Sequence, residues 1–384
     1  MYEEVRLKRL LDWGLGNPQG PISIHIDPTN RCNVRCKFCW QRSHERMGWL
    51  DLTNELSDDR LVSLAKEAHK LGVRDWLISG GGEPLVRTKA TLELMKEIKK
   101  YEMDGDIITN GTFFNEKNVK ELVELGWDRI RLSLHSPDEK DHDSLMNTKG
   151  SYQKIINAAK LISKWKKKLG KDKPEMGFNT VINSYNYKKF DEIVKLLAEL
   201  GGNLLNVQTI ILYDDKEKQY SLNDKQRKEF PKYVKKAVKQ AKKYNIKTNL
   251  HDYMDEEVVE KSTELGEMHQ IMENIHPGFF GSYCFEPWYL ITIRANGIVG
   301  SCRLFGDEGD NLHKKSLKEI WYGKYYARNR KVLEDHKKHD FCKHCGSNEF
   351  IENRRIGNEL FKIEKKRKKK KNKNKNKENE RKNK

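Results

Sequence analysis

Six short apolar runs, each followed by a longer amphipathic stretch, constrain the fold of this chain more than any other feature. They are Ile22–Asp27, Asp75–Ser79, Asp106–Thr109, Arg129–Leu134, Gly177–Ile182 and Leu204–Thr209. The stretches between them carry apolar residues at i, i+3 and i+4, which is the spacing of a helix with one buried face. A strand followed by a helix, repeated in this way, predicts an α/β fold with a parallel sheet covered by helices.

The rest of the chain has a different pattern. Residues Lys225–Lys243 are basic and amphipathic, which predicts a helix, and 245–275 continues with mixed helical character. From about 281 the pattern predicts a hairpin over 289–300 with its turn at Asn-Gly, then a helix over Ser316–Leu333. We therefore predict four parts: a helical lead-in over 1–20, a βα body with a helical connection over 21–280, a small hairpin-and-helix unit over 281–355 and a tail over 356–384.

Positive charge is concentrated at the C-terminal end. The chain has a formal net charge of +18, of which Lys362–Lys384 carries +11. A like-charged run rich in Lys and Asn, without aromatic residues, buries too little apolar surface to fold, so we predict a disordered basic tail. Such a tail attracts an acidic surface or nucleic acid through counterion release. It lacks the aromatic residues that stack on the bases of single-stranded nucleic acid.

The composition excludes several classes of protein. No apolar run approaches the ~20 residues that span a bilayer, and the first residues lack the basic-then-apolar shape of a signal peptide. We therefore expect a cytoplasmic protein that makes no membrane contact. Because that compartment is reducing, the seven cysteines are not expected to form a disulfide set.

Three cysteines follow the first predicted strand. Cys32, Cys36 and Cys39 have the spacing C-x3-C-x2-C, which lets their thiolates wrap one iron–sulfur cubane or one zinc ion. A structural zinc ion takes four ligands, and His44 is the nearest residue that supplies a fourth. Three thiolates on a cubane instead leave one iron open to an outside ligand. Their position, at the end of a strand, is where α/β proteins build active sites.

Glycine or polar residues follow the next predicted strands. The second ends in Ser79-Gly-Gly-Gly-Glu83-Pro84, where glycine lets the backbone approach a ligand and Glu83 accepts hydrogen bonds from an ammonium group. The third ends in Thr109-Asn110-Gly111. Ser133 and His135 end the fourth, and strand alternation places both on one face. A histidine here is either a general base or a surface residue.

The other four cysteines lie in the C-terminal part: Cys284, Cys302, Cys342 and Cys345. They follow the order C-x12-G-x4-C, a gap of 39 residues, and C-x2-C. Four thiolates make a closed site for zinc or for a [4Fe–4S] cluster, and taken alone the pattern favours zinc. The two groups together use all seven cysteines, which is not expected of unrelated thiols.

The first cysteine group and the strand ends resemble the signature of the radical S-adenosylmethionine (SAM) superfamily, C-x3-C-x-aromatic-C followed by Gly-Gly-Glu. The resemblance implies a partial (β/α)6 TIM barrel in which the three cysteines hold a [4Fe–4S] cluster whose open iron binds SAM. It also implies that Gly81, Gly82 and Glu83 hold the SAM amino group. Phe38 is the aromatic residue, and many relatives carry Asp near His135. Other residues at the ends of later strands complete the candidates for SAM binding: Asn110, Ser133, Asn183 and Gln208.

The second cysteine group resembles the "twitch" domain, the shortened form of the SPASM extension of radical SAM enzymes. Gly297 falls at the glycine of that pattern, and Leu317-Lys-Glu-Ile-Trp321 resembles the segment that follows it. A full SPASM domain has seven cysteines and two clusters, so four cysteines imply one auxiliary [4Fe–4S] cluster. Four cysteine ligands leave no open iron, which favours electron transfer over substrate chelation.

The resemblance predicts an oxygen-sensitive oxidoreductase that generates a 5′-deoxyadenosyl radical and abstracts hydrogen from a substrate C–H. The auxiliary cluster would complete an oxidation, and a ferredoxin or flavodoxin would donate electrons. The substrate is a small molecule or a peptide, with peptide crosslinking, epimerisation or formylglycine formation as the first alternative. RNA modification is the second. A zinc-stapled binding protein without activity is the remote alternative, because it does not explain the first cysteine group together with Gly-Gly-Glu.

Overall fold

The computed structural model describes residues 2–42, 51–211, 215–254, 258–259, 279–303, 309–339, 342 and 345–382. The strands are β1 Ser23–Ile26, β2 Asp75–Ile78, β3 Asp104–Thr109, β4 Arg129–Leu132, β5 Glu175–Val181, β6 Leu204–Gln208, β7 Lys247–Thr248, β8 Leu290–Ile293, β9 Ile298–Gly300 and β10 Asp310–Asn311. The α-helices are α1 Tyr2–Gly14, α2 Asp58–Lys70, α3 Thr88–Lys100, α4 Glu116–Leu125, α5 Glu139–Met146, α6 Ser151–Leu169, α7 Phe190–Glu199, α8 Asp215–Lys218, α9 Asp224–Lys243, α11 Leu317–Trp321, α12 Lys324–Glu334 and α13 Ser347–Lys382. Short 3₁₀ helices are η1 Trp40–Arg42, η3 Pro84–Arg87, η4 Leu250–Met254, η6 Phe279–Gly281 and η7 Glu286–Trp288.

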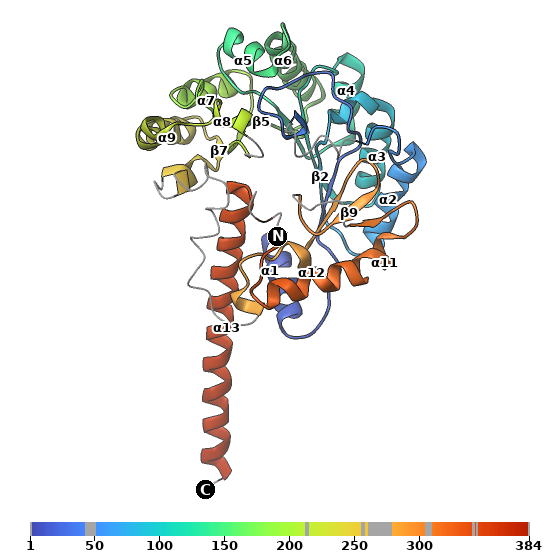
Figure 1. Cartoon of the computed structure of the whole chain (residues 1–384), viewed down its shortest axis with the longest axis vertical. Helices are drawn as coiled ribbons and strands as arrows, with labels where there is room; N and C mark the ends of the chain where they lie inside the picture. The colour runs from blue at the N-terminus through green and yellow to red at the C-terminus, as the bar shows by residue number, and fades with distance from the viewer. Residues whose placement is uncertain are drawn as a thin grey trace.

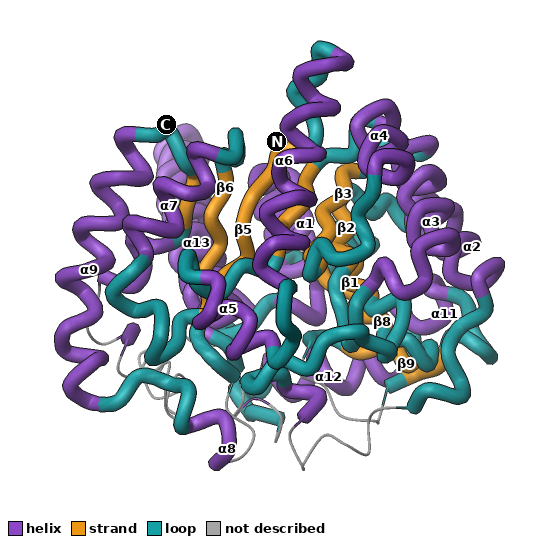
Figure 2. Tube along the Cα trace, turned by 90° about the horizontal axis from the view of Figure 1, so that it is seen from above, coloured by secondary structure: helices purple, strands orange, loops and turns teal. Residues whose placement is uncertain are grey.

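The strands that the structure describes form one sheet, in the order β10-β9-β8-β1-β2-β3-β4-β5-β6-β7. Neighbours from β1 to β7 are parallel, because helices connect consecutive strands. In Figure 1 helices α2 to α7 and α9 form an open arc around the strands, and Figure 2 shows the strands from the side, behind α5 and α6. The predicted partial barrel is confirmed, and each of the six predicted runs overlaps one of the strands β1 to β6.

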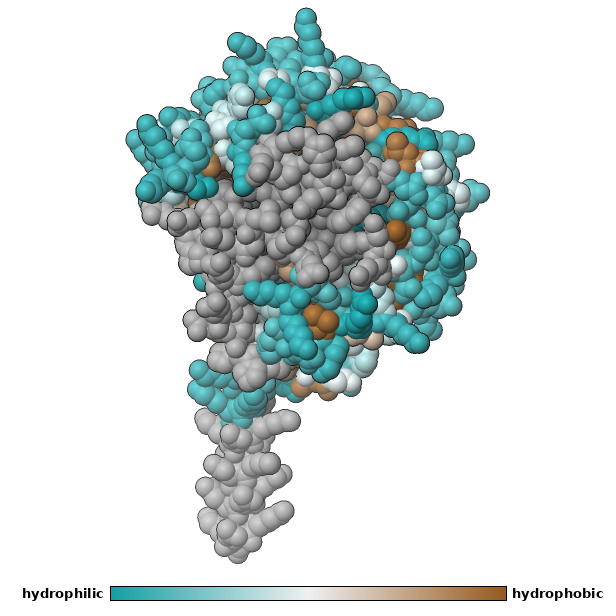
Figure 3. Space-filling view, in the orientation of Figure 1, coloured by the Kyte–Doolittle hydropathy of each residue, from teal (hydrophilic) through white to brown (hydrophobic). Residues whose placement is uncertain are grey.

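Alternate residues of each strand face opposite sides of this arc. On the outer side Ile24, Trp76 and Phe178 are fully buried beneath the helices. On the inner side the walls are polar, and His25 and Arg131 line a cavity. The helices bury apolar stripes that match the outer side, and the surface they show in Figure 3 is mostly hydrophilic. The core therefore lies between sheet and helices, which leaves the inside of the arc for polar contacts.

The predicted C-terminal hairpin is confirmed as β8 and β9, with its turn at Asn296-Gly297. It is not a separate sheet, because β8 runs parallel to β1, with Ile291 beside Ile24 and Ile293 beside Ile26. These side chains join the same hydrophobic core. The hairpin thus extends the barrel sheet beyond β1, and the domain boundary near residue 281 stays a prediction.

The helix that we predicted over Ser316–Leu333 is instead two helices, α11 and α12. Ser316 begins α11 with a capping box, in which its side chain accepts from the Glu319 N–H and the Glu319 side chain accepts from the Ser316 N–H. Gly323 then adopts an extended backbone, with ψ of 176°, before α12 begins. That conformation interrupts the helical hydrogen-bond pattern, so one helix cannot continue through this position.

The tail that we predicted to be disordered from residue 356 is helical, as part of α13. Ile356 and Leu360, four residues apart, are buried in a cluster with Leu10 of α1 and Phe285. This packing starts the helix on the body of the protein. Lys, Arg and Glu are good helix formers, and the basic run continues α13 away from the body (Figure 1). The prediction was wrong because it considered the charged run alone, without the buried apolar residues Ile356 and Leu360 that precede it.

Two further expectations concern membrane-spanning helices and the helical stretch after residue 225. No helix in the part of the chain that the structure describes is long and apolar enough to cross a membrane. Helix α9 confirms the predicted basic helix, and η4 lies at the start of the stretch predicted to be of mixed helical character. Most of the remainder of 245–275 lies outside the described residues, as does His44.

Candidate functional site

A cavity of about 220 Å³ lies at the carboxyl ends of the barrel strands. It brings together eleven residues that the sequence singles out: Cys32, Cys36, Phe38, Cys39, Gly81, Gly82, Glu83, Asn110, Ser133, His135 and Gln208. They come from the loops and ends of five different strands, so the parallel sheet gathers them at one edge. One candidate, Asn183, is absent from the cavity wall.

Asn183 has a local role instead. It is fully buried, its Oδ1 accepts the N–H groups of Tyr185 (2.9 Å) and Asn186 (3.1 Å), and its Nδ2 donates to the Val181 carbonyl (2.9 Å). These bonds use the side chain to fold the loop after β5. An asparagine at a strand end often forms hydrogen bonds with the nearby backbone in this way. Its position in the sequence therefore could not show whether Asn183 binds a ligand or folds its own loop.

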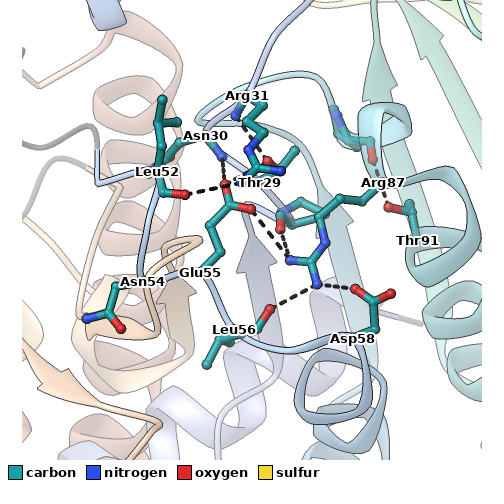
Figure 4. Close-up of polar contacts among 12 residues, drawn as sticks. Thr29, Asn30, Arg31, Leu52, Asn54, Glu55, Leu56, Asp58, Arg87 and Thr91 are labelled. Atoms are coloured by element: carbon teal, nitrogen blue, oxygen red, sulfur yellow. Dashed lines mark hydrogen bonds and ion pairs between the residues drawn. The ribbon is translucent and has the colours of Figure 1, made fainter.

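The loop that carries the first cysteines is fixed where it leaves β1 (Figure 4). The Glu55 carboxylate accepts the Thr29 hydroxyl (2.7 Å) and the Asn30 N–H (2.8 Å). Arg87, at the end of η3, donates to the Pro28 carbonyl (2.8 Å) and the Leu56 carbonyl (2.9 Å), and its guanidinium lies 3.9 Å from Glu55. The cysteine loop, the segment before α2 and the Gly-Gly-Glu turn are therefore held as one unit.

Three consecutive glycines let the turn after β2 pack directly on the cysteine loop. An added Cβ would lie 1.9 Å from the Gly82 carbonyl oxygen at Gly80, 2.2 Å from the Asn30 side chain at Gly81, and 2.0 Å from the Arg31 carbonyl oxygen at Gly82. No side chain fits at any of these positions. Gly81 and Gly82 are therefore required for the contact between the two loops, and Gly80 is required for the fold of the turn itself.

Glu83 ties this turn to the next strand. Its carboxylate accepts the Thr109 hydroxyl (2.6 Å), the Asn110 N–H (2.7 Å) and the Leu85 N–H (3.0 Å). Burial raises the pKa of Glu83, and these three hydrogen bonds oppose the rise. The Glu83 carboxylate lines the cavity, and these hydrogen bonds fix its orientation. A carboxylate with a fixed orientation is suited to hold an ammonium group.

His135 stands on the opposite wall as a neutral imidazole. Its Nδ1 accepts the Val181 N–H (3.3 Å), and its ring meets Phe38 edge-on with centroids 4.9 Å apart. Behind it the His142 ring is stacked, and His142 Nδ1 accepts the His135 N–H (3.2 Å). Burial lowers the pKa of His135 to about 3 and that of His142 to about 4. A buried neutral imidazole of this pKa is a poor general base at neutral pH.

The four C-terminal cysteines converge on a second cavity, which Cys284, Cys302, Cys342 and Cys345 all line. Burial raises the pKa of the thiols of Cys284, Cys342 and Cys345. Buried thiolates need a cation to stabilise them, and a metal centre with sulfur ligands supplies it. The donor set and the burial therefore fit a metal–sulfur centre at this position.

The two cysteine groups differ from a site for a single ion. Among the residues that the structure describes, no three Cys, His, Asp or Glu side chains lie close enough to share one metal ion. The donors are seven thiolates, in one group of three and one group of four. Thiolates are the soft ligands that iron–sulfur clusters take.

A third cavity, the lumen, occupies the polar inside of the arc and measures about 320 Å³. It shares Asn179 and Gln208 with the first cavity and Glu286 and Arg303 with the second. Arg303 follows Cys302 and donates to the Ser79 hydroxyl (2.5 Å) at the end of β2. The lumen therefore adjoins both cysteine groups.

Sequence reasoning missed several residues of these walls, notably His25, Arg131, Asn179 and Arg303. A signal was present for Arg131, because Ser133 and His135 lie two and four residues further along the same alternation. No signal was present for Arg303, which enters the lumen only because the C-terminal hairpin joins the barrel sheet.

Comparison with known proteins agrees with this geometry. Residues 26–168 match the radical SAM superfamily, and residues 284–346 match an iron–sulfur cluster-binding domain, SPASM. The chain belongs to the radical SAM superfamily and carries a C-terminal SPASM iron–sulfur domain. Its cofactors are a [4Fe–4S] cluster with SAM and an auxiliary iron–sulfur cluster.

The curated relatives match over part of their length. A tungsten-containing aldehyde ferredoxin oxidoreductase cofactor-modifying protein from Pyrococcus furiosus is 28% identical over 191 residues, 49% of this chain and 51% of that protein. A PqqA peptide cyclase from Granulibacter bethesdensis is 27% identical over 194 residues, 50% of this chain and 48% of that protein. The chain thus spans about half the length of these relatives.

Two solved structures share the fold. SuiB from Streptococcus suis bound to its precursor peptide SuiA is 20% identical, with a TM-score of 0.63 over 89% of this chain and 74% of that chain. The protein anSMEcpe with bound AdoMet is 19% identical, with a TM-score of 0.60 over 88% of this chain and 97% of that chain. The likeness covers both the barrel and the C-terminal region.

Proposed function

We propose that this protein is a radical SAM oxidoreductase that oxidises a side chain of a peptide. When bound, the first cluster and SAM supply a 5′-deoxyadenosyl radical, which takes a hydrogen atom from a substrate C–H. Cys32, Cys36 and Cys39 hold the cluster, and Glu83 receives the SAM amino group. Phe38 and His135 form the facing wall.

One observation supports the proposed oxidation: the lumen adjoins both cysteine groups. A two-electron oxidation needs two electron acceptors. One electron leaves the substrate with the hydrogen atom, and the second must reach another acceptor. We assign Cys284, Cys302, Cys342 and Cys345 as the ligands of a [4Fe–4S] cluster, which would supply the acceptor for an electron from a substrate in the lumen. A ferredoxin or flavodoxin in the reducing cytoplasm exchanges electrons with both clusters.

The relatives support a peptide as substrate class. SuiB was solved with a precursor peptide, anSMEcpe with a peptide, and the Granulibacter relative is a peptide cyclase. The same relationship keeps crosslinking as the alternative outcome, since a substrate radical that attacks a neighbouring group forms a bond before the second electron leaves. RNA modification has no further support.

The test is iron content together with SAM cleavage. Wild type and a Cys32/Cys36/Cys39→Ala triple variant are reconstituted anaerobically, and iron, sulfide and 5′-deoxyadenosine formed after reduction with dithionite are measured. We expect about eight irons in wild type and about four in the variant, with 5′-deoxyadenosine from wild type only. Iron with no 5′-deoxyadenosine would contradict the proposed reaction, and four irons falling to none would remove the auxiliary electron acceptor.

A further inference from the structure

Positive charge is concentrated in two segments of this chain. Helix α9 has nine basic and two acidic residues, a net charge of +7, and Lys362–Lys384 carries +11. Together they account for the whole formal charge of +18, so the rest of the chain is neutral overall. Helix α9 packs against the body of the protein, so its charge has a fixed place in the fold.

The lysines of α9 form a row along one side of the helix. They recur after three and four residues in turn, which is close to one helical turn, so successive side chains lie above one another. The row extends over about 26 Å of helix, with about 5 Å between neighbouring lysines along the axis. This lysine row consists of Lys225, Lys228, Lys232, Lys235, Lys239 and Lys242, and all six side chains are exposed.

The opposite side of α9 belongs to the core. Phe230, Val234, Ala237 and Ala241 are buried there, and the centroid of the Phe230 ring lies 5.8 Å from that of the Phe190 ring of α7. Helix α9 lies on the outside of the arc (Figure 1). Its apolar stripe is therefore already covered, and a partner that approaches α9 from outside meets the lysine row.

The protein itself does not neutralise the lysine row. Among the described residues, no carboxylate oxygen lies within 4.0 Å of any ammonium group of the row. The two acidic residues of α9 have other partners: Asp224 pairs with Arg227, and the Glu229 carboxylate lies 3.7 Å from Lys188. Like charges three or four residues apart destabilise a helix, so a bound polyanion would remove a repulsion that the protein leaves uncompensated.

We propose that the lysine row of α9 is a docking surface for a nucleic acid strand, which it binds through the phosphates. Interfaces with nucleic acid are polar and strongly positive, whereas interfaces between proteins are depleted in lysine and have apolar centres. A helix that lies on a membrane buries an apolar face among the lipids, and the apolar face of α9 is already buried in the protein. A flexible chain of phosphates is therefore the polyanion that this surface fits.

The chemistry of the lysine row also sets what kind of binding to expect. Ammonium groups that contact phosphates position a strand and do not read its sequence, so binding should fall steeply as the salt concentration rises. The row lies outside the barrel, so the nucleic acid is a docking partner and not the substrate in the lumen. This inference is independent of the proposed function, because it concerns other residues and a different measurement.

The test measures the binding of fluorescein-labelled polyuridylate by fluorescence anisotropy. The full-length, anaerobically reconstituted protein is titrated into this probe at pH 7, at KCl concentrations from about 50 to 200 mM. The row variant is Lys228/Lys235/Lys239→Gln, which removes three charges and keeps residues of good helix propensity.

A matched control variant removes the same number of charges from other parts of the surface. It is Lys66/Lys117/Lys140→Gln, which changes one exposed lysine in each of α2, α4 and α5. Because the two variants have the same net charge, any difference in their affinity for polyuridylate reports the position of the lysines.

We expect the row variant to bind polyuridylate at least about tenfold more weakly than wild type at the lowest salt concentration. The slope of log Kd against log [KCl] should fall by about 2, because each phosphate contact on a single strand contributes about 0.7. The affinity of the control variant should differ from that of wild type by less than about threefold. Iron content and 5′-deoxyadenosine formation should be equal in all three proteins, which shows that the row variant is folded.

Equal loss of affinity in the row variant and the control variant would mean that binding follows net charge alone, and would overturn the proposal. Binding that disappears on removal of residues 365–384 would overturn it as well, because the basic half of α13 would then be the site. Tighter binding of polyglutamate or of phosphatidylserine vesicles than of polyuridylate would assign the row to an acidic protein or to a membrane. If 5′-deoxyadenosine forms and no polyuridylate binds, this inference fails and the proposed function stands.

Discussion

At the scale of single residues, the cysteine loop depends on side chains that never meet a ligand. Glu55 accepts two hydrogen bonds from the residues just before Cys32, and its side chain is only 10% exposed. Arg87 fixes the carbonyl that precedes them. Neither residue belongs to a recognisable motif, yet both set the position from which the first thiolates project.

We therefore predict that Glu55→Ala lowers iron at the first site and spares the second. Both hydrogen bonds go to Oε1 of Glu55, so removing the carboxylate leaves the Thr29 hydroxyl and the Asn30 N–H unpaired, at a cost of about 1–3 kcal/mol each. Iron per chain should fall from about eight toward about four without loss of folded protein by circular dichroism. Glu93→Ala, on the exposed face of α3, is the control. Equal loss at both sites would show a general effect on folding.

The stacked histidines predict how stability depends on pH. Folded His135 and His142 have pKa values of about 3 and about 4, whereas an unfolded histidine has a pKa of about 6.5. The unfolded chain therefore binds more protons below pH 6.5, so this stability is present above that pH and is lost as the pH falls toward 4.

The variant His142→Asn isolates one of these protons, because its amide oxygen replaces Nδ1 as acceptor for the His135 N–H. Between pH 6.5 and 4.5 the free energy of unfolding should fall less steeply than in wild type, by up to about 1.4 kcal/mol per pH unit. Urea unfolding of the apoprotein at several pH values measures this slope. Identical slopes in the two proteins would mean that His142 is already protonated in the folded state.

At the scale of elements, α13 has two halves with different roles. Its first turns close the lumen: Ser347 accepts or donates a hydrogen bond with the Tyr253 hydroxyl (2.8 Å), and Arg355 pairs with Asp252. Its ion pairs further along, Lys362–Glu359 and Lys368–Glu364, stay within the helix. The anchored half therefore belongs to the fold, and the basic half extends from it (Figure 1).

Removing residues 365–384 should leave the melting temperature, iron content and SAM cleavage within error of wild type. Leu360→Ala provides the contrast, because Leu360 is fully buried against α1 and its truncation should cost about 2–5 kcal/mol. The free energy of unfolding of both variants is measured by urea unfolding of the apoprotein. A large loss of stability on removing residues 365–384 would show that the basic half makes contacts with the body of the protein.

At the scale of the whole molecule, the C-terminal hairpin and the barrel form one sheet, so the two cluster sites share a framework. The Tyr326 hydroxyl strengthens the join, since it donates toward the carbonyl oxygens of Leu290 (3.0 Å) and Gly300 (2.7 Å). Helix α12 thereby holds both strands of the hairpin. The distance between the two cysteine cavities is consequently set by sheet geometry and does not depend on a flexible linker.

A continuous sheet predicts cooperative unfolding. In hydrogen exchange of the apoprotein at increasing urea, β8 (Leu290–Ile293) and β2 (Asp75–Ile78) should lose protection at the same urea concentration. Helix α9, which covers the far end of the sheet, provides an independent reference. If β8 lost protection well before β2, the C-terminal unit would be a separately folding domain.

Local patterns in the sequence were enough to predict the barrel and the positions of both cysteine groups. The βα periodicity, the two cysteine spacings and the Gly-Gly-Glu turn are local patterns, and parallel strands necessarily bring their carboxyl ends to one edge. Ten of the predicted SAM and cluster residues reached that edge together with Gln208. These features were readable because each depends on neighbours within a few residues.

The tertiary structure alone decided what depends on distant contacts. β8 pairs with β1 across more than 260 residues of chain, and only that pairing brings Arg303 to Ser79 and into the lumen. The helical state of residue 356 onward depends on packing against Leu10 and Phe285. The Asn183 side chain forms hydrogen bonds within its own loop and does not line the cavity. Periodicity and spacing carry no information about such long-range packing, because the energy of each contact arises only when the sheet closes around it.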